Sequence, residues 1–262
     1  MLESIAAIGI EVIKWVIPII VFNGFIYLRH YHKVKRHLRA FFNNFDREET
    51  ILIIPPADID PVLKETQVFD FLGAMELQDM FSRLGYKLKR VRADKIAEDE
   101  LKHNLVSVSG PIPNKVTRFL LNQNEIVYAF GGSDGHSIIN KSNSEKRFDP
   151  WKKDGVYITR DFGMITKMKN PYNPDKDVII ACGSFGWGTQ AALRILADPV
   201  SLKYLNSFGQ YFQILCTCGV DEDKVGLKPY LVDLCPDDSL RQETIVNLYN
   251  KKGGRNDEKS RK

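Results

Sequence analysis

A strand, a glycine-rich turn and the start of a helix follow one another in Val178-Ile-Ile-Ala-Cys-Gly-Ser-Phe-Gly-Trp-Gly-Thr189. An open α/β sheet normally holds its ligand at such a place, where the carboxyl end of a strand enters a helix. The chain has a second such place, where a predicted strand at 105–108 leads through Ser109-Gly-Pro-Ile-Pro-Asn114 into a predicted helix at 115–121. We call residues 109–114 the first glycine turn and residues 183–189 the second.

Outward from these turns, apolar strand-like stretches alternate with helical patterns. Strands are predicted at 51–54, 86–91, 105–108, 126–130, 178–182, 211–217 and 230–234, and helices at 69–84, 94–102, 115–121 and 187–196. This alternation predicts an α/β fold with a doubly wound, mostly parallel sheet and helices on both faces, over residues 50–240. Residues 131–154, rich in Gly, Ser, Asp, Asn and Lys, are typical of loops or hairpins.

The two glycine turns predict a site for a negatively charged ligand. Helix N-termini present unpaired N–H groups and a partial positive charge, and glycine lets the backbone approach an anion closely. The alternative is that the glycines only make tight turns, with Asn114 and Thr189 as helix caps. Trp187 either closes the core or stacks on a base or sugar. The predicted ligand-binding residues are Gly110, Asn114, Gly183, Gly186, Trp187, Gly188 and Thr189.

The order of these motifs resembles a known module. Ser109-Gly-Pro-Ile-Pro-Asn-Lys-Val-Thr117, Phe162-Gly-Met-Ile165, Lys169-Asn-Pro-Tyr-Asn-Pro174 and Cys182-Gly-Ser-Phe-Gly-Trp-Gly-Thr-Gln-Ala-Ala192 are similar to a Rossmann-like module of uncharacterised bacterial and archaeal proteins. A related version looks like part of archaeal surface-layer proteins. The resemblance covers roughly residues 50–235 and implies a Rossmann-like fold, without catalytic residues to carry over. Ser109 stands where that module has glycine.

Acid–base candidates lie outside the two turns. Asp134 and His136 follow a predicted strand in Gly131-Gly-Ser-Asp-Gly-His136 and could act as an acid–base pair, or the loop is a flexible surface turn. Asp161 could lie near the same rim. The four cysteines include only one Cys-x-Cys, at 216–218, with no second pair and no nearby histidine, so no metal site is predicted.

The N-terminal stretch predicts a membrane anchor. Residues 5–28 form a run of 24 mostly apolar residues, about 36 Å as a helix, and residues 29–39 contain five Lys or Arg. These features predict a transmembrane anchor at 1–29, a basic juxtamembrane linker at 30–49, lipid contacts through 5–39 and a cytoplasmic C-terminal domain. Glu11, Lys14 and Pro18 interrupt the run, and an interfacial helix at 2–14 is an alternative. Residues 241–262 are predicted to hold a helix end and a disordered basic tail.

Composition narrows the function classes. Apolar residues make up 44% and charged residues 27% of the chain, as in an ordinary globular protein. The net charge of +4 nearly vanishes without residues 29–39 and the tail, so no nucleic-acid partner is expected. We expect a sensor or regulatory module that binds a nucleotide-like or other anionic small ligand. A nucleotide-processing enzyme (hydrolase or glycosyl transfer) and a purely structural or partner-binding domain are the alternatives, and no cofactor is indicated.

Overall fold

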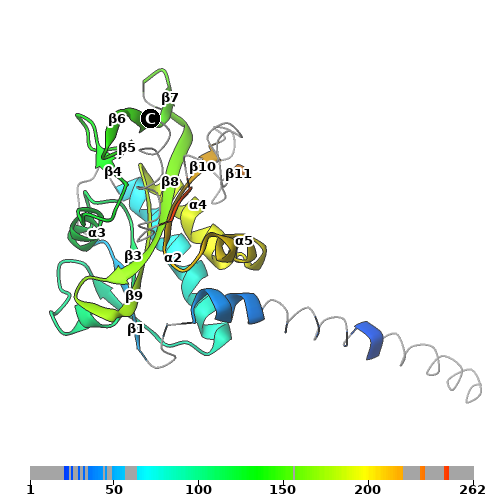
Figure 1. The fold of residues 1–262 in the computed structure, drawn as a ribbon. Helices are drawn as coiled ribbons and strands as arrows, with labels where there is room; N and C mark the ends of the chain where they lie inside the picture. Colours follow the sequence, from blue (N-terminus) through cyan, green and yellow to red (C-terminus); the bar gives the residue numbers. More distant parts are fainter. Residues whose placement is uncertain are drawn as a thin grey trace, which may run out of the picture.

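The computed structural model describes residues 21–23, 25, 29, 32, 35–43, 45, 49–56, 64–155, 157–220, 231–233 and 245–247. In this part of the chain a large sheet of nine strands forms the centre of the domain (Figure 1). Its main path runs in the order β11 (Leu231–Asp233), β10 (Phe212–Gly219), β8 (Tyr157–Asn170), β9 (Asn173–Gly183), β3 (Asn104–Val108), β1 (Thr50–Ile54) and β2 (Leu88–Arg92). The short strands β12 (Ile245–Asn247) and β7 (Trp151–Lys153) pair with β10 and β8.

The sheet is mixed, so the prediction of a mostly parallel sheet was wrong. Neighbouring strands are parallel from β9 through β3 and β1 to β2. The pairs β8–β9, β8–β10 and β10–β11 are antiparallel. The reason is the tight turn after Asn170, which pairs with Asn173: a turn this short can join only antiparallel strands. The prediction of an α/β fold is confirmed.

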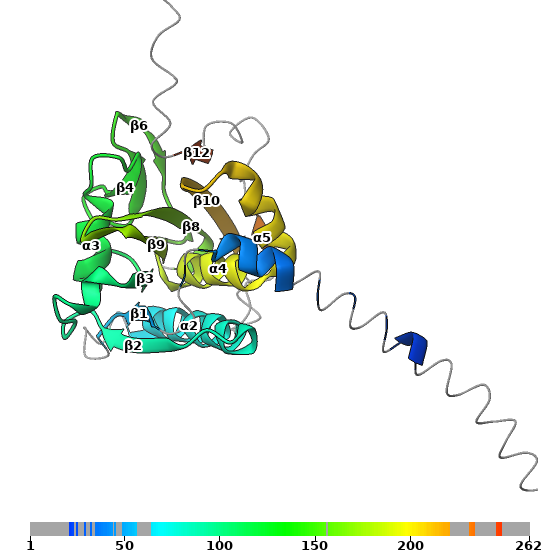
Figure 2. The ribbon, with the colours of Figure 1, turned by 60° about the horizontal axis from the view of Figure 1, so that its bottom comes forward.

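Alternating residues of the central strands face two different cores. In β1, Ile51 and Ile53 belong to one buried cluster and Leu52 to the other, as the two-residue period of a strand requires. The cluster around Leu52 is covered by α2 (Lys64–Leu84), α4 (Gly186–Ala197) and α5 (Pro199–Leu205). The opposite cluster is covered by α3 (Lys115–Leu121) and a small antiparallel sheet of β4 (Tyr128–Gly131), β5 (Ser137–Asn140) and β6 (Asn143–Phe148) (Figure 2).

Residues 131–154, predicted as loops or hairpins, contain the hairpin strands β5, β6 and β7. Two other segments differ from their predicted structure. The stretch 94–102, predicted as a helix, contains only a short 3-10 helix, η1 (Glu100–Lys102). Helix α5 was not predicted, although Asp198 caps its first turn and Pro199 occupies its first position, which is a recognisable start signal. Within 241–262, the described residues form β12.

The predicted transmembrane anchor is contradicted. Among the described residues, no helix is long and apolar enough to cross a membrane. The apolar run is broken by Glu11, Lys14 and Pro18, and intramembrane charges cost a few kcal/mol each. The prediction of a cell-membrane protein with a cytoplasmic domain depended on this span and is corrected with it. Most of the span itself, and most of the predicted lipid contacts at 5–39, lie outside the described residues.

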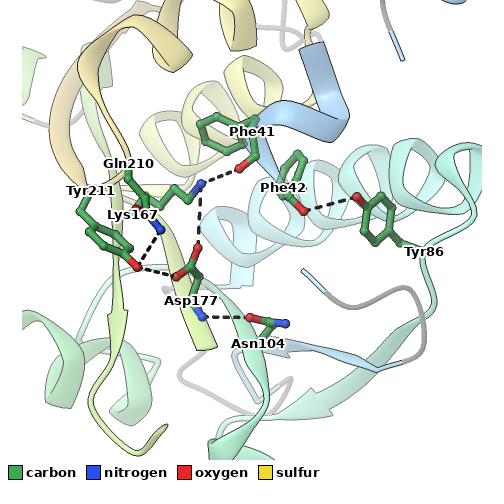
Figure 3. Close-up of polar contacts among 8 residues, drawn as sticks. All are labelled: Phe41, Phe42, Tyr86, Asn104, Lys167, Asp177, Gln210 and Tyr211. Carbon is green, nitrogen blue, oxygen red and sulfur yellow. Dashed lines mark hydrogen bonds and ion pairs between the residues drawn. The ribbon is translucent and has the colours of Figure 1, made fainter. Parts of the chain in front are cut away.

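The described part of the predicted linker packs into the domain instead. Helical residues 35–41 lead to the buried side chains of Phe41, Phe42 and Phe45. The Tyr86 hydroxyl donates to the Phe42 carbonyl oxygen at 3.3 Å, and the buried Lys167 amine donates to the Phe41 carbonyl oxygen (Figure 3). This segment therefore covers one end of the large sheet.

Candidate functional site

The two glycine turns meet in one cleft. Strands β3 and β9 are parallel neighbours, so both turns emerge at the same edge of the sheet, and the Ser109 N–H donates to the Ala181 carbonyl oxygen at 3.1 Å. The cavity volume of the cleft is about 40 Å³, and the volume that includes its open mouth is about 440 Å³. Its lining comes from both turns, α2, β4 and the loop before β5: Asp70, Ser109, Gly110, Pro111, Ile112, Pro113, Phe130, Gly135, His136, Gly183, Ser184, Phe185, Gly186 and Thr189.

Asn114, predicted as a ligand-binding residue, is the cap of α3. Its Oδ1 atom accepts from the backbone N–H groups of Val116 and Thr117, at 3.0 and 3.1 Å. Its Nδ2 group donates to the Val108 carbonyl oxygen and to the Ser107 hydroxyl, at 2.7 and 3.2 Å. The side chain is fully buried, and these bonds use both its acceptor and its donor group. The first helix start is therefore satisfied from within the chain.

Asp161 satisfies the second helix start in the same way. Its carboxylate, on β8, accepts from the backbone N–H groups of Gly188 at 2.5 Å, Phe162 at 2.8 Å and Phe185 at 3.2 Å. A Cβ atom on Gly188 would lie 2.1 Å from the Phe162 carbonyl oxygen, so this glycine is needed for α4 to pack on β8. The amides that were predicted to attract an anion thus already bind a carboxylate of the protein. Asp161 is a capping residue beneath the cleft.

Burial raises the pKa of Asp161 to about 7, although the N–H groups of Gly188, Phe162 and Phe185 oppose this rise. The side chain is fully buried. Its three donors favour the charged form, and the loss of water around the carboxyl group disfavours it. Asp161 is therefore not the exposed acid–base group that the sequence suggested.

Of the other predicted residues, His136 lines the cleft, while Asp134 and Trp187 are not among the described residues that do. The Asp134 carboxylate accepts from the His136 backbone N–H at 3.1 Å and shapes the loop. Trp187 stacks on Phe69 with ring centroids 3.5 Å apart and packs against the core. Gly183 serves packing as well, since a Cβ atom there would lie 2.2 Å from the Thr189 nitrogen. Gly110, Gly186 and Thr189 line the cleft.

The orientation of His136 is fixed by the second turn. Its Nδ1 atom lies 2.7 Å from the Ser184 carbonyl oxygen, which can only accept, so Nδ1 carries the proton in this contact. The ring stacks on Phe185 at 4.3 Å with an interplanar angle of 13°. In the neutral imidazole the Nε2 atom is then the hydrogen-bond acceptor.

The sequence analysis missed Asp70, the most unusual residue of the cleft. Its side chain comes from α2 and is 4% exposed, and its Oδ1 atom has no hydrogen-bond partner in the described part of the chain. Burial raises the pKa of Asp70 to about 7, the hydroxyls of Ser109 and Thr189 oppose the rise, and the charge of Asp161 adds to it. The sequence pattern could have indicated its burial, because Asp70 lies on the same face of α2 as the buried Ala74, Leu77, Phe81 and Leu84.

Packing of α2 against α4 carries Asp70 to the cleft. A Cβ atom on Gly73 would lie 2.6 Å from the Leu193 Cδ1 atom, so the two helices approach closely one turn after Asp70. Ser184 contributes a second buried polar atom, because its Oγ also lacks a partner among the described side chains and backbone. Ser109 has a φ of +84°, a backbone conformation that is uncommon for a residue other than glycine.

The site offers little for a metal ion. No group of three or more His, Cys, Asp or Glu side chains that could hold a metal occurs among the described residues. Cys182, Cys216 and Cys218 are buried in the core, and Cys235 lies outside the described residues. The arrangement can instead hold a small molecule between a carboxyl group, an imidazole and apolar walls.

A scan against protein-family models gives no match for this chain, and a search of curated proteins gives no significant match. The resemblance to a Rossmann-like module therefore stays a prediction.

Proposed function

We propose that the domain binds a small polar molecule in the cleft between the two glycine turns and acts as a ligand-binding, regulatory module. The observation that carries this proposal is Asp70, a buried carboxyl group that lines the cleft with one oxygen unpartnered among the described residues. Leaving a buried acceptor unsatisfied costs about 1–3 kcal/mol, and more for a charged group. A ligand that donates a hydrogen bond to Asp70 would remove this cost.

A second hollow lies next to the cleft. Its cavity volume is about 230 Å³, and it shares Pro111, Ile112, Phe130 and Gly135 with the cleft. The two cavity volumes together stay just below those of small-molecule sites, about 300–1,000 Å³, so a bound molecule would extend into the open mouth. Because Ile112 and Phe130 line both hollows, a ligand could contact Asp70 with one end and apolar side chains with the other.

Thermal unfolding of the full chain tests the proposal. The chain is heated alone and with members of a panel of nucleotides, nucleosides, sugars and amino acids. A ligand at 100 times its Kd stabilises the folded state by about 2.7 kcal/mol, which raises the melting temperature by several degrees. If no member of the panel raises it, the proposal is wrong.

A matched pair of variants locates the site. Ile112 is 40% exposed at the cleft, so Ile112→Trp adds bulk there with little change to the core. We expect this variant to lose the ligand-induced shift. Val200 on α5 is 77% exposed and is not among the described residues that line the cleft, so Val200→Trp should keep the shift. Equal shifts in both variants would place the ligand elsewhere.

An enzyme is the second candidate, and one observation favours it. Asp70, with its pKa raised to about 7 by burial, lines the same cleft as His136. A carboxyl group with a raised pKa beside an imidazole is suited to general acid–base catalysis, for example in the hydrolysis of a nucleotide. Product formation from each ligand that binds would be followed by chromatography. Turnover that is lost in Asp70→Asn and in His136→Gln, with the fold retained, would establish catalysis.

A further inference from the structure

We infer that the cleft selects a neutral ligand by a pair of sugar hydroxyls, as a nucleoside carries on its ribose, and disfavours the phosphorylated form. This inference rests on the proposed function and names its ligand class. It differs from the anionic ligand that the glycine turns predicted. Three features of the described residues carry it: the occupied helix starts, the unpartnered buried acceptors and the apolar walls.

Side chains of the protein already occupy several of the N–H groups that a phosphate would use at the two helix starts. A phosphate at the end of a strand normally accepts from the first N–H groups of the next helix. Here the Gly188 and Phe185 N–H groups donate to Asp161, and those of Val116 and Thr117 donate to Asn114. A phosphate at the floor of the cleft would meet the Asp70 carboxyl group instead, which repels it once ionised.

The cations near the cleft do not replace these donors. The Arg118 guanidinium donates to the Pro111 and Ile112 carbonyl oxygens, at 2.9 and 3.2 Å. The Lys152 amine lies over the Phe185 ring, 5.2 Å from its centroid, on an exposed strand. Arg118 lines the second hollow and Lys152 lines neither hollow, so among the described residues neither supplies a donor at the floor beside Asp70.

The buried acceptors fit hydroxyl donors. The Asp70 Oδ1 atom and the Ser184 Oγ atom are both buried, line one cleft and lack partners in the described structure. A carboxylate can accept two O–H bonds, so neighbouring hydroxyls of one sugar can bind it together. An ammonium ligand is less favourable, because a charge pair this deeply buried must lose the hydration of both ions.

The walls above this floor fit a flat apolar group. Pro111, Ile112 and Phe130 line the passage from the cleft to the second hollow, and the His136 ring is stacked on Phe185 beside it. Aromatic and proline side chains favour contact with planar rings. A molecule with hydroxyls at one end and a planar ring at the other therefore matches the site from floor to mouth.

Isothermal titration of the full chain tests the inference with four sets of probes. These are the ribonucleosides adenosine, guanosine, cytidine and uridine, their 5′-monophosphates, their 2′,3′-dideoxy forms, and free ribose. We expect at least one ribonucleoside to bind, with the affinity lowered at least tenfold in its monophosphate and in its dideoxy form. Binding of free ribose as tightly as of any nucleoside would keep the hydroxyl recognition and remove the need for the base.

Two carboxylate variants complete the test. Asp70→Asn should lower the affinity for the ribonucleoside at least tenfold while its melting temperature shows that it folds. Asp79, exposed on the same helix α2 and not among the described residues that line the cleft, provides the control: Asp79→Asn is the same chemical substitution and should bind as the parent chain does.

The two ideas fail in different ways. The inference is overturned if monophosphates bind as tightly as nucleosides, if only a cationic or non-hydroxylated panel member binds, or if Asp70→Asn binds normally. In these cases the proposed function stands as long as Ile112→Trp loses the ligand-induced shift. The proposed function itself fails when no panel member binds, or when Ile112→Trp and Val200→Trp show equal shifts.

Discussion

The two ends of the large sheet bury polar groups in opposite ways. At the amino ends of the parallel strands, the buried Lys167 amine donates to the Phe41 carbonyl oxygen, lies 4.7 Å from the centre of the Phe41 ring and stands 4.0 Å from Asp177 (Figure 3). The Tyr211 hydroxyl donates to Asp177 at 3.1 Å. At the carboxyl ends, Asp70 and Ser184 each keep an unpartnered buried oxygen among the described residues.

This difference separates a structural polar cluster from the cleft in which we propose a ligand. The cluster at the amino ends is covered by the segment around Phe41, which Asn206 also holds through a 3.1 Å bond to the His37 carbonyl oxygen. Buried polar groups in native proteins are nearly always hydrogen-bonded. The unpartnered oxygens of Asp70 and Ser184 at the carboxyl ends therefore need an explanation, and the bonded groups at the amino ends do not. The cleft between the glycine turns supplies one.

The largest expected effect is at the paired end. Lys167→Met removes one partner of a buried ion pair and the donor to the buried Phe41 carbonyl oxygen, so the free energy of unfolding should fall by about 3–5 kcal/mol. Urea denaturation measures this loss. Lys169, exposed on the same strand, provides the control, and Lys169→Met should change the stability by less than about 0.5 kcal/mol. Similar losses in both variants would contradict a structural role for the cluster.

Asp161 should be the next most costly residue to remove. Asp161→Ala leaves the Gly188, Phe162 and Phe185 N–H groups without their acceptor, so we expect a loss of about 2–4 kcal/mol in urea denaturation. Asp161→Asn keeps an oxygen acceptor and should lose less. If Asp161→Ala unfolds at the same urea concentration as the parent chain, Asp161 is not the cap of α4.

Much of this architecture could be predicted from the sequence. The apolar runs at 51–54, 105–108 and 178–182 are strands, and the turns after the last two do converge, because parallel neighbours end at one edge. The mixed sheet could not be predicted, since the direction of β8 depends on a turn at Asn170 whose pairing only the fold reveals. Residues 5–28 were interpreted by hydropathy alone, and the burial of Phe41 and Phe42 in the domain depends on tertiary contacts.

The site was predicted less well than the fold. The convergence of the two turns was predicted, but the buried carboxyl group of Asp70 in the cleft was not. Asp161 and Asn114 fill the helix starts from within the chain, and the partners of a helix N-terminus across a sheet are not visible in the sequence. Asp70 lies 39 residues before the first turn and reaches it only because α2 crosses α4 at Gly73. Its place on an apolar stripe was the available signal.

The pH dependence of stability distinguishes the two ends further. Burial raises the pKa of both Asp70 and Asp161 to about 7, from an ordinary value of 3.8. Between about pH 4 and 7 the unfolded chain loses protons that the folded chain keeps, so stability should fall as the pH rises through this window. The slope is at most about 1.4 kcal/mol per pH unit for each carboxyl group. Urea denaturation at pH 4.5, 5.5, 6.5 and 7.5 measures it, and a stability that rises over this range would contradict the burial of these groups in uncharged form.

The smallest expected effect on stability is at Asp70, the residue to which we assign the ligand. At pH 5 the folded chain holds Asp70 mainly protonated, so Asp70→Asn replaces one neutral group by another of nearly the same shape, and the free energy of unfolding should change by less than about 1 kcal/mol. At pH 7.5 the variant no longer carries a buried carboxylate and should be as stable as the parent chain or more stable. Its free energy of unfolding should therefore fall less steeply between pH 5 and pH 7.5 than that of the parent chain. A buried Asp70 that does not stabilise the fold would be explained by the proposed ligand binding. If Asp70→Asn instead loses as much stability as Asp161→Ala, Asp70 is a structural residue, and the two ends of the sheet differ less than their hydrogen bonds suggest.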